Sequence, residues 1–248
     1  MGAALALLAL LAGCASAPHA EDPRDPWEGY NRGMTNFNNA VDGAILKPVA
    51  TIYQKTLPRP ARTGVSNFFG NLSDVWSLAN NVLQVRPQEA MTSFWRVALN
   101  TTLGLCGVLD PATDLRLPRT REDFGQTLGY WGVPSGPYLV LPILGPSTLR
   151  DTVALPVDWY GHPLAQVEDV PVRNWLHVVQ FVDIRSQLLG VDDLMNTAAP
   201  DTYAFTRDAY LQKRLNDIYN GAPPQTEERY DLDEQGHTLP VQSAPAGR

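Results

Sequence analysis

Apolar residues recur at the spacing of an amphipathic helix in three long stretches of the chain. The first helix is predicted to begin at Pro87 and the second at Pro171, because proline suits the first turn of a helix. The third is predicted over residues 203–220, with Gly221 as its C-cap. Their apolar stripes are Met91, Phe94, Trp95 and Ala98; Trp175, Val178, Val179 and Val182; and Leu211, Leu215, Ile218 and Tyr219.

Shorter helices are predicted between these stretches, and no run of alternating apolar and polar residues argues for a sheet. The predicted fold class is therefore all-α. Tryptophan and tyrosine rings near the helices suit a membrane interface, but we expect most of them to pack in a core. The shorter helices are expected at residues 28–42, 60–69, 72–84 and 146–155; the rings are Trp76, Trp95, Trp131, Tyr138, Trp159 and Tyr160.

The first residues resemble a lipoprotein signal. The apolar run at residues 3–12 has the length of a signal-peptide core and is too short to span a bilayer. It ends in LAGC at residues 11–14, which resembles the lipobox, so residues 1–13 are predicted to be removed and Cys14 to carry lipid. Ala15 follows the convention for sorting to the outer membrane. Cys106 then has no partner for a disulfide, and its uncharged surroundings predict a buried packing residue.

Composition limits the rest of the chain. The formal net charge is −7 and 44 % of the residues are hydrophobic, so a core is possible and nucleic-acid binding is not indicated. Residues 14–26 are expected to be a lipidated tether and residues 27–221 the helical domain. Residues 222–248 are polar and acidic, and we expect them to be disordered because they have little apolar surface to bury.

Residues 124–149 contain no charged side chain. The segment is long enough to span a membrane, but four prolines and five glycines break any helix there. Irregular backbone at membrane depth must be buried in protein or line a cavity. The sequence leaves both alternatives open: a buried loop, or the wall of an apolar passage. Charged pairs flank the segment at residues 122–123 and 150–151, where helix capping or ion pairing is expected.

No catalytic or metal site is predicted. The histidines have no metal-ligand spacing, and the polar stripe of Arg173, His177 and Gln180 is expected to leave His177 in water. No nucleophile elbow or phosphate-binding glycine loop is present, and Ser147 is interpreted as an early helix residue. The sequence therefore predicts a protein that is not an enzyme and has no cofactor.

Several segments together resemble the MlaA/VacJ family of outer-membrane lipoproteins, over residues 25–221. The longest matching block runs from residue 122 to residue 151. The matching motifs are DPWEGYNR at 25–32, NFFGNL at 67–72, NTTLG at 100–104, EDFGQTLG at 122–129, GPYLVLP at 136–142, LGPS at 144–147, RD at 150–151, and Tyr203, Arg207, Tyr210, Leu211, Gln212 and Arg214.

The resemblance implies a ring of amphipathic helices seated in the inner leaflet of the outer membrane, facing the periplasm. Phospholipids misplaced in the outer leaflet would pass through a central channel to a soluble periplasmic lipid carrier. The resemblance also implies association with trimeric porins. A porin-associated structural lipoprotein without transport activity is the alternative.

Two uncharged stretches are candidates for the lipid path. We expect residues 103–109 and 137–146 to line or border the path, and two residues of the first helix to help set its closed state. The candidates are Leu103, Leu105, Val108, Leu109, Pro137, Tyr138, Leu139, Val140, Leu141, Pro142, Ile143 and Leu144, with Phe37 and Asn38 for the closed state.

Overall fold

The computed structural model describes residues 22–198 and 201–224, and most of them are helical. The all-α class is confirmed, with one small hairpin. Cys14 and the predicted signal peptide, residues 1–13, lie outside the described residues, as does the tail from residue 225. The elements are α2 (Glu28–Val41), the π-helical turn η1 (Asp42–Leu46), α3 (Lys47–Thr56), α4 (Arg59–Leu83), α5 (Pro87–Thr102), α6 (Pro111–Asp114), α7 (Phe124–Tyr130), β1 (Tyr138–Leu141), β2 (Gly145–Thr148), α8 (Leu149–Gly161), the 3₁₀ turn η2 (Pro163–Gln166), α9 (Val170–Ala198) and α10 (Thr202–Ile218).

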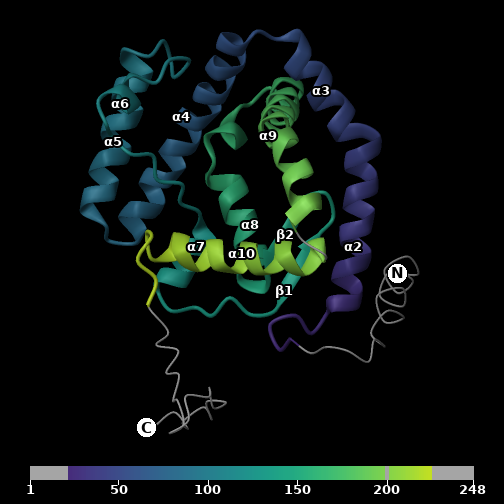
Figure 1. Cartoon of the computed structure of the whole chain (residues 1–248). Coiled ribbons are helices and arrows are strands. Elements are labelled where there is room, and N and C mark those ends of the chain that lie inside the picture. The colour runs from purple at the N-terminus through teal and green to yellow at the C-terminus, as the bar shows by residue number, and fades with distance from the viewer. Residues whose placement is uncertain (1–21, 199–200, 225–248) are drawn as a thin grey trace, which may run out of the picture.

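The long helices are arranged around the middle of the molecule. In Figure 1, α4, α3 and α2 form an outline that α10 closes along the bottom, and α8 and α9 lie inside it. Helix α5 packs along α4, α9 packs on α3 and α4, and α7 packs between α8 and α10. Elements distant in sequence thus meet around the centre of the fold.

Short polar side chains cap the N-termini of several helices. Asp123, Thr148 and Asp201 accept hydrogen bonds from the backbone N–H groups of Gln126, Asp151 and Ala204, at 2.8, 3.2 and 3.1 Å. These N-caps pair first-turn N–H groups that no helix carbonyl can reach. The predicted capping by residues 122–123 is confirmed at Asp123.

The predicted long helices are confirmed at α5, α9 and α10, but two predictions nearby were wrong. Residues 60–69 and 72–84 belong to one helix, α4, which continues through Gly70. The helix expected at residues 146–155 begins only at Leu149, because Ser147 lies in strand β2 and Thr148 is the N-cap.

A two-stranded hairpin forms where no sheet was expected. Strands β1 and β2 pair antiparallel, from Tyr138 opposite Thr148 to Leu141 opposite Gly145. The turn between them needs left-handed backbone at Ile143 (φ 65°) and at Gly145 (φ 80°), a conformation that glycine adopts without strain.

Two asparagines of α2, seven positions apart, bind the open edge of this hairpin. Asn31 donates to the carbonyl of Tyr138 (3.1 Å) and accepts from the N–H of Val140 (2.8 Å). Asn38 donates to the carbonyl of Leu141 (2.8 Å) and accepts from the N–H of Ile143 (2.7 Å). The two amides therefore replace a third strand, and the edge of β1 is paired without another strand beside it.

The distribution of polarity is inverted relative to a water-soluble bundle. Among the described residues, 21 polar or charged ones are buried against 10 apolar ones, so hydrogen bonds and ion pairs fill much of the interior. Many large apolar side chains are exposed instead. Of the rings expected in a core, Trp95, Trp131, Trp159 and Tyr160 are exposed and that expectation was wrong for them, whereas Tyr138 is buried.

Cys106 is also exposed, so the prediction of a buried thiol was wrong. It lies in the turn after α5, where both Leu105 and Cys106 have left-handed backbone (φ 52° and 57°). Within the described residues, no helix is long and apolar enough to cross a membrane.

Candidate functional site

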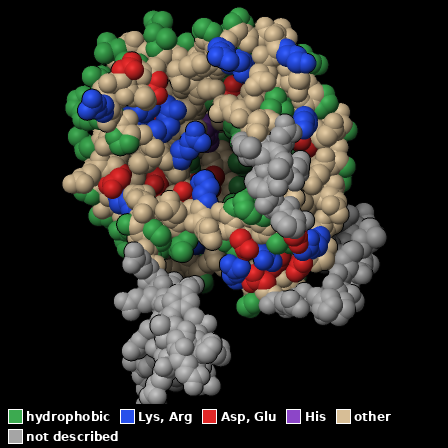
Figure 2. Space-filling view, viewed as in Figure 1, with side chains coloured by type: hydrophobic (Ala, Val, Ile, Leu, Met, Phe, Trp, Pro, Cys, Tyr) green, Lys and Arg blue, Asp and Glu red, His purple; other side chains and the backbone are tan. Residues whose placement is uncertain are grey.

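Two cavities adjoin in the middle of the fold. One has a volume of about 450 Å³ and the other about 560 Å³. Figure 2 shows a hollow near the centre of one face, with Lys and Arg side chains gathered beside it. The two cavities are adjacent, because six side chains line both of them. The shared residues are Ser73, Trp76, Asp123, His162, Gln180 and Arg214.

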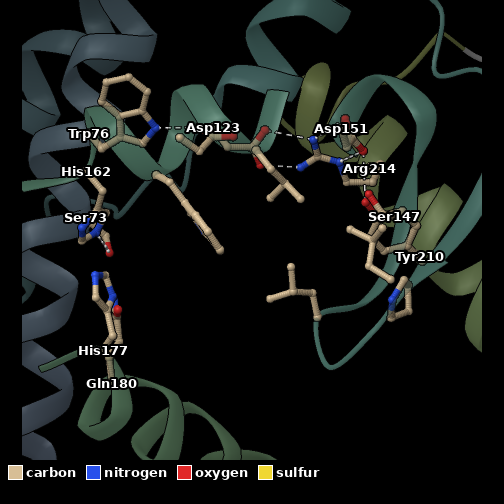
Figure 3. Close-up of a pocket in the computed structure, with 16 residues that line it drawn as sticks. Ser73, Trp76, Asp123, Ser147, Asp151, His162, His177, Gln180, Tyr210 and Arg214 are labelled. Carbon is tan, nitrogen blue, oxygen red and sulfur yellow. Dashed lines mark hydrogen bonds and ion pairs between the residues drawn. The ribbon is translucent and has the colours of Figure 1, made fainter. Parts of the chain in front are cut away.

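The smaller cavity has an apolar wall and a charged wall. Leu141, Leu144 and Pro146 of the hairpin and Leu155 and Trp159 of α8 supply the apolar wall. In Figure 3, His162, His177 and Ser73 lie on one side of this cavity, and Arg214, Asp151, Ser147 and Tyr210 lie on the other. We name it the hairpin cavity.

Arg214 of α10 holds the charged wall together. It donates to both carboxylate oxygens of Asp123, at 2.6 and 2.9 Å, and to both of Asp151, at 2.9 Å each. Tyr210 and Arg150 donate to Asp151 as well. Burial by itself would raise the pKa of both carboxyls, but Arg214 outweighs it, so the pKa of Asp123 and of Asp151 lies below the usual range. The cluster therefore carries its charges in pairs and joins α7, α8 and α10.

Asp158 ties Trp76 into the same wall. It accepts hydrogen bonds from the Trp76 indole N–H (2.8 Å) and from the backbone N–H of Phe124 (2.7 Å). Burial raises the pKa of Asp158, and the two hydrogen bonds together with the charge of Arg214 offset that effect only in part. These bonds fix the Trp76 ring between the two cavities.

Ser73 and His162 lie close together, but the direction of their hydrogen bond does not suit nucleophilic catalysis. The Ser73 hydroxyl donates to the carbonyl of Phe69 (3.0 Å), and its oxygen lies 3.4 Å from Nε2 of His162. Nδ1 of His162 accepts from the N–H of Leu164 (3.3 Å), so in the neutral ring the proton is on Nε2. Burial, followed by the charge of His177, lowers the pKa of His162. The ring therefore donates to Ser73 and does not act as its base.

The larger cavity has a more charged lining and extends between α4, α9 and α10. Arg119, Arg121 and Lys213 line it, together with Glu122, Asp183 and Asp217. We name it the charged cavity. Asp183 is buried and accepts hydrogen bonds from Tyr53 (3.0 Å), Ser66 (2.8 Å) and Gln187 (2.9 Å), which join α9 to α3 and α4.

The polar side of α9 faces this interior space. Gln180 lines both cavities, and His177, which is exposed as expected, lines the hairpin cavity. The apolar stripe on the other side leaves Trp175, Val178 and Val179 exposed. The first half of helix α9 thus has polar side chains toward the cavities and apolar ones outward, and further along the helix Ile184 and Leu188 line the charged cavity as well.

The structure brings only some of the proposed path residues to the cavities. Leu141 and Leu144 line the hairpin cavity, whereas Tyr138 and Val140 are buried in a core cluster with Tyr203. Asn38 binds the hairpin turn, and Phe37 is exposed. The remaining candidates line neither cavity: Pro137 and Leu139 are half-buried, and Pro142, Ile143, Leu103, Leu105, Val108 and Leu109 are exposed.

Several residues of the cavity walls were not predicted as site residues. Trp76, His162 and Arg214 come from three separate helices or turns. The flanking pairs at 122–123 and 150–151 were interpreted as local, but Arg214 joins them from 91 and 63 positions away. The sequence signal for this junction was only the charge at both ends of an uncharged segment.

Comparisons with known proteins agree with this architecture. Residues 23–217 match the family model of the MlaA lipoprotein. The chain is 41 % identical over 217 residues to the intermembrane phospholipid transport system lipoprotein MlaA of Escherichia coli (strain K12), covering 86 % of this chain and 85 % of that protein. The protein of the same name from Haemophilus influenzae is 34 % identical over 218 residues, covering 84 % of this chain and 86 % of the relative.

A solved structure has the same fold. It comes from work on the structural basis for maintenance of bacterial outer membrane lipid asymmetry. The two structures superpose with a TM-score of 0.69 at 38 % sequence identity, and the match covers 78 % of this chain and 98 % of the other.

Proposed function

Because the chain belongs to the MlaA lipoprotein family, we propose that it removes mislocalised phospholipids from the outer leaflet of the outer membrane. The lipid passes through the two adjoining cavities as an amphipathic channel and is handed to a soluble periplasmic carrier. Transport of this kind maintains the lipid asymmetry of the outer membrane and uses no catalytic group or cofactor.

One observation carries the proposal: the protein is apolar outside and polar inside. Exposed apolar side chains such as Trp95, Trp159 and Trp175 suit contact with acyl chains, and tryptophan suits the membrane interface. A phospholipid has a charged headgroup that is costly to move through hydrocarbon. Adjoining cavities with polar and apolar walls would give that headgroup a path and keep the acyl chains on apolar surface.

The membrane position follows from the same distribution. In the described residues no helix can cross the bilayer, so we propose that the helices form a ring in the inner leaflet. Lipid on Cys14 would deliver the ring to the outer membrane, and the apolar helix faces would embed it. The exposed leucines of residues 103–109 then border the membrane and not the path itself.

The hairpin is proposed to set the state of the channel. Leu141 and Leu144 form part of the path wall, and Asn38 holds both sides of their turn through two hydrogen bonds. Loss of those bonds would free the turn to move relative to the cavity. Phe37, the neighbouring residue, is exposed and would contact lipid.

Trimeric porins are proposed as partners at the outer membrane. A structural lipoprotein that rides on porins without moving lipid is the second candidate, and the family name of the relatives favours it less. The two candidate functions differ in whether blocking the passage changes outer-leaflet phospholipid. A transporter needs a passage open to lipid, so blocking the passage in folded, correctly localised protein abolishes its effect on outer-leaflet phospholipid.

The test is a charge placed in the hairpin cavity. Cells that lack the chromosomal copy should accumulate outer-leaflet phospholipid, and the wild-type gene should reverse this. Leu144→Asp should fail to reverse it, because a carboxylate in the apolar wall opposes passage of acyl chains. Leu144→Met is the matched control, since it keeps an apolar side chain of similar size.

Outer-membrane fractionation must show equal amounts of both variants. If Leu144→Asp restored asymmetry as well as Leu144→Met, the channel-wall assignment would be wrong. If deletion of the gene left outer-leaflet phospholipid unchanged, the transport function itself would be wrong.

A further inference from the structure

The two cavities differ in whether their cations are already paired. Arg214 lines both cavities, and it is fully engaged by Asp123 and Asp151. In the charged cavity, Arg119 is engaged by Asp74 and Asp110, at 3.1 and 3.3 Å. Neither guanidinium has a pair of parallel N–H groups left to bind a ligand.

Arg121 is different. It lines the charged cavity and is exposed, and its side chain makes no hydrogen bond or ion pair with any other residue in the described ranges. Its backbone is nevertheless fixed, because Gln126 donates to its carbonyl (2.9 Å) and Asp123, two positions on, caps α7. A rigid backbone therefore presents an unpaired guanidinium to the cavity.

Lys213 adds a second positive charge to the same cavity. Its ammonium lies 2.5 Å from Asp217 one helical turn later, but the side chain is 71 % exposed, so water screens this pair. Arg121 and Lys213 are thus the two cations of this cavity that a ligand can reach without breaking a buried ion pair.

We propose that Arg121, assisted by Lys213, binds the phosphodiester of the phospholipid in the charged cavity. This assignment rests on the proposed function and specifies where the lipid's phosphate is held. A guanidinium offers two parallel N–H groups that match two phosphate oxygens. The acyl chains lie along the apolar wall of the hairpin cavity, past Trp76.

The hairpin cavity lacks an unpaired cation for the phosphate. Carboxylates line both cavities, but the one arginine of the hairpin cavity is Arg214, which is already paired, whereas the charged cavity also has Arg121 and Lys213. The histidine that it shares with the charged cavity, His162, is held neutral by burial. A phosphate there would face acidic groups without a free cation, so the lipid has one favourable orientation across the junction.

The test measures binding to the purified full-length lipoprotein in neutral detergent micelles, by isothermal titration calorimetry. The probes are dihexanoylphosphatidylethanolamine and dihexanoylglycerol, which carry the same chains with and without the phosphodiester. Arg121→Gln should weaken binding of the phospholipid about tenfold, as expected for loss of a charge-assisted hydrogen-bonded pair, and leave binding of the diacylglycerol unchanged.

Two further variants separate the phosphate contact from general charge. Arg116→Gln is the matched control, because Arg116 is also exposed, has no partner among the described residues and lines neither cavity. It should change neither affinity. Arg121→Lys should retain part of the phospholipid affinity, because it keeps the charge and loses the fork.

Other outcomes overturn the assignment. An equal loss of affinity for both ligands in Arg121→Gln would mean that the residue shapes the cavity and does not bind phosphate. No loss of affinity for either ligand would mean that Arg121 is not part of the site. Inorganic phosphate that bound as tightly as the phospholipid, with the same dependence on Arg121, would show a free-phosphate site. If Arg121→Gln bound like the wild type while Leu144→Asp abolished transport, the phosphate site alone would fail. If wild-type protein bound no phospholipid, both proposals would fail.

Discussion

Replacing Asn31 with alanine should destabilise the protein strongly, because one buried amide completes the edge of the hairpin. Its side chain is fully buried and makes three hydrogen bonds: to the carbonyl of Tyr138, from the N–H of Val140, and to Asp25 (2.8 Å). Truncation leaves the two backbone groups without partners in a space too closed for easy hydration.

The magnitude follows from those groups. A buried polar group left unpaired costs about 1–3 kcal/mol, so two backbone groups cost roughly 2–6 kcal/mol before the loss at Asp25 is counted. Alanine returns only about 0.5 kcal/mol through its better helix propensity. The net loss is a large part of the roughly 5–15 kcal/mol that stabilises a typical domain.

The assay is denaturant unfolding in neutral detergent micelles, with three variants of the same helix. Asn31→Ala should lose about 4 kcal/mol, within the range for buried unpaired groups. Asn38→Ala removes two comparable bonds at a half-buried position, where water replaces them, and should lose about 1 kcal/mol. Asn36→Ala is the control, because that side chain is exposed and makes no hydrogen bond among the described residues. Coincident unfolding curves for Asn31→Ala and Asn36→Ala would refute the reasoning.

Three other changes test the charged wall, the buried histidine and the anchor. Arg214→Met should cost about 3–5 kcal/mol, because it leaves Asp123 without its cation and Asp151 with Arg150 alone. Because Arg214 outweighs burial and lowers both carboxyl pKa values, the wild type should lose stability in acid below about pH 4, as those carboxyls protonate. The variant should lose less stability over the same pH range in pH-dependent unfolding. Burial and the charge of His177 lower the pKa of His162, so near neutral pH the unfolded chain binds a proton more readily than the folded protein does. The stability of the wild type should therefore fall as the pH drops below about 6.5, and His162→Gln should remove that part of the pH dependence. Identical pH profiles for the two proteins would contradict this assignment. Cys14→Ala should abolish function by mislocalisation, seen by membrane fractionation; activity from a variant seated in the outer membrane without lipid would show the lipid to be dispensable.

The helices were predictable because their signal is local. The apolar stripe after Pro87 and the glycine at position 221 each depend on residues within one or two helical turns, and the structure has helices α5 and α10 at these places. The hairpin was not predictable in this way. Its strands have four residues each, and the groups that pair its edge come from Asn31 and Asn38, about 100 positions earlier in the chain.

The candidate site was predictable in its apolar part. An uncharged segment broken by proline pointed to Leu141 and Leu144, which line a cavity. The charged part depends on long-range convergence, since Arg214 meets carboxylates far away in sequence, and periodicity does not report which helices meet. The misplacement of Trp95 and Trp159 has another cause. Apolar rings are expected inside a protein when the solvent is water, and that expectation reverses if the outer faces contact lipid, as we propose for this chain.

The ion pairs inside the fold have a consequence for its thermal behaviour. Arg96 is fully buried between α4 and α6, where it binds Asp74 (3.2 Å) and Asp110 (2.8 Å). Unfolding exposes such polar groups to water, which lowers the heat capacity, whereas apolar helix faces that already contact detergent or lipid contribute little of the usual increase. The heat-capacity change of unfolding should therefore fall well below the roughly 12–15 cal/mol/K per residue of soluble domains. Stability would then vary almost linearly with temperature, with cold denaturation displaced far below freezing.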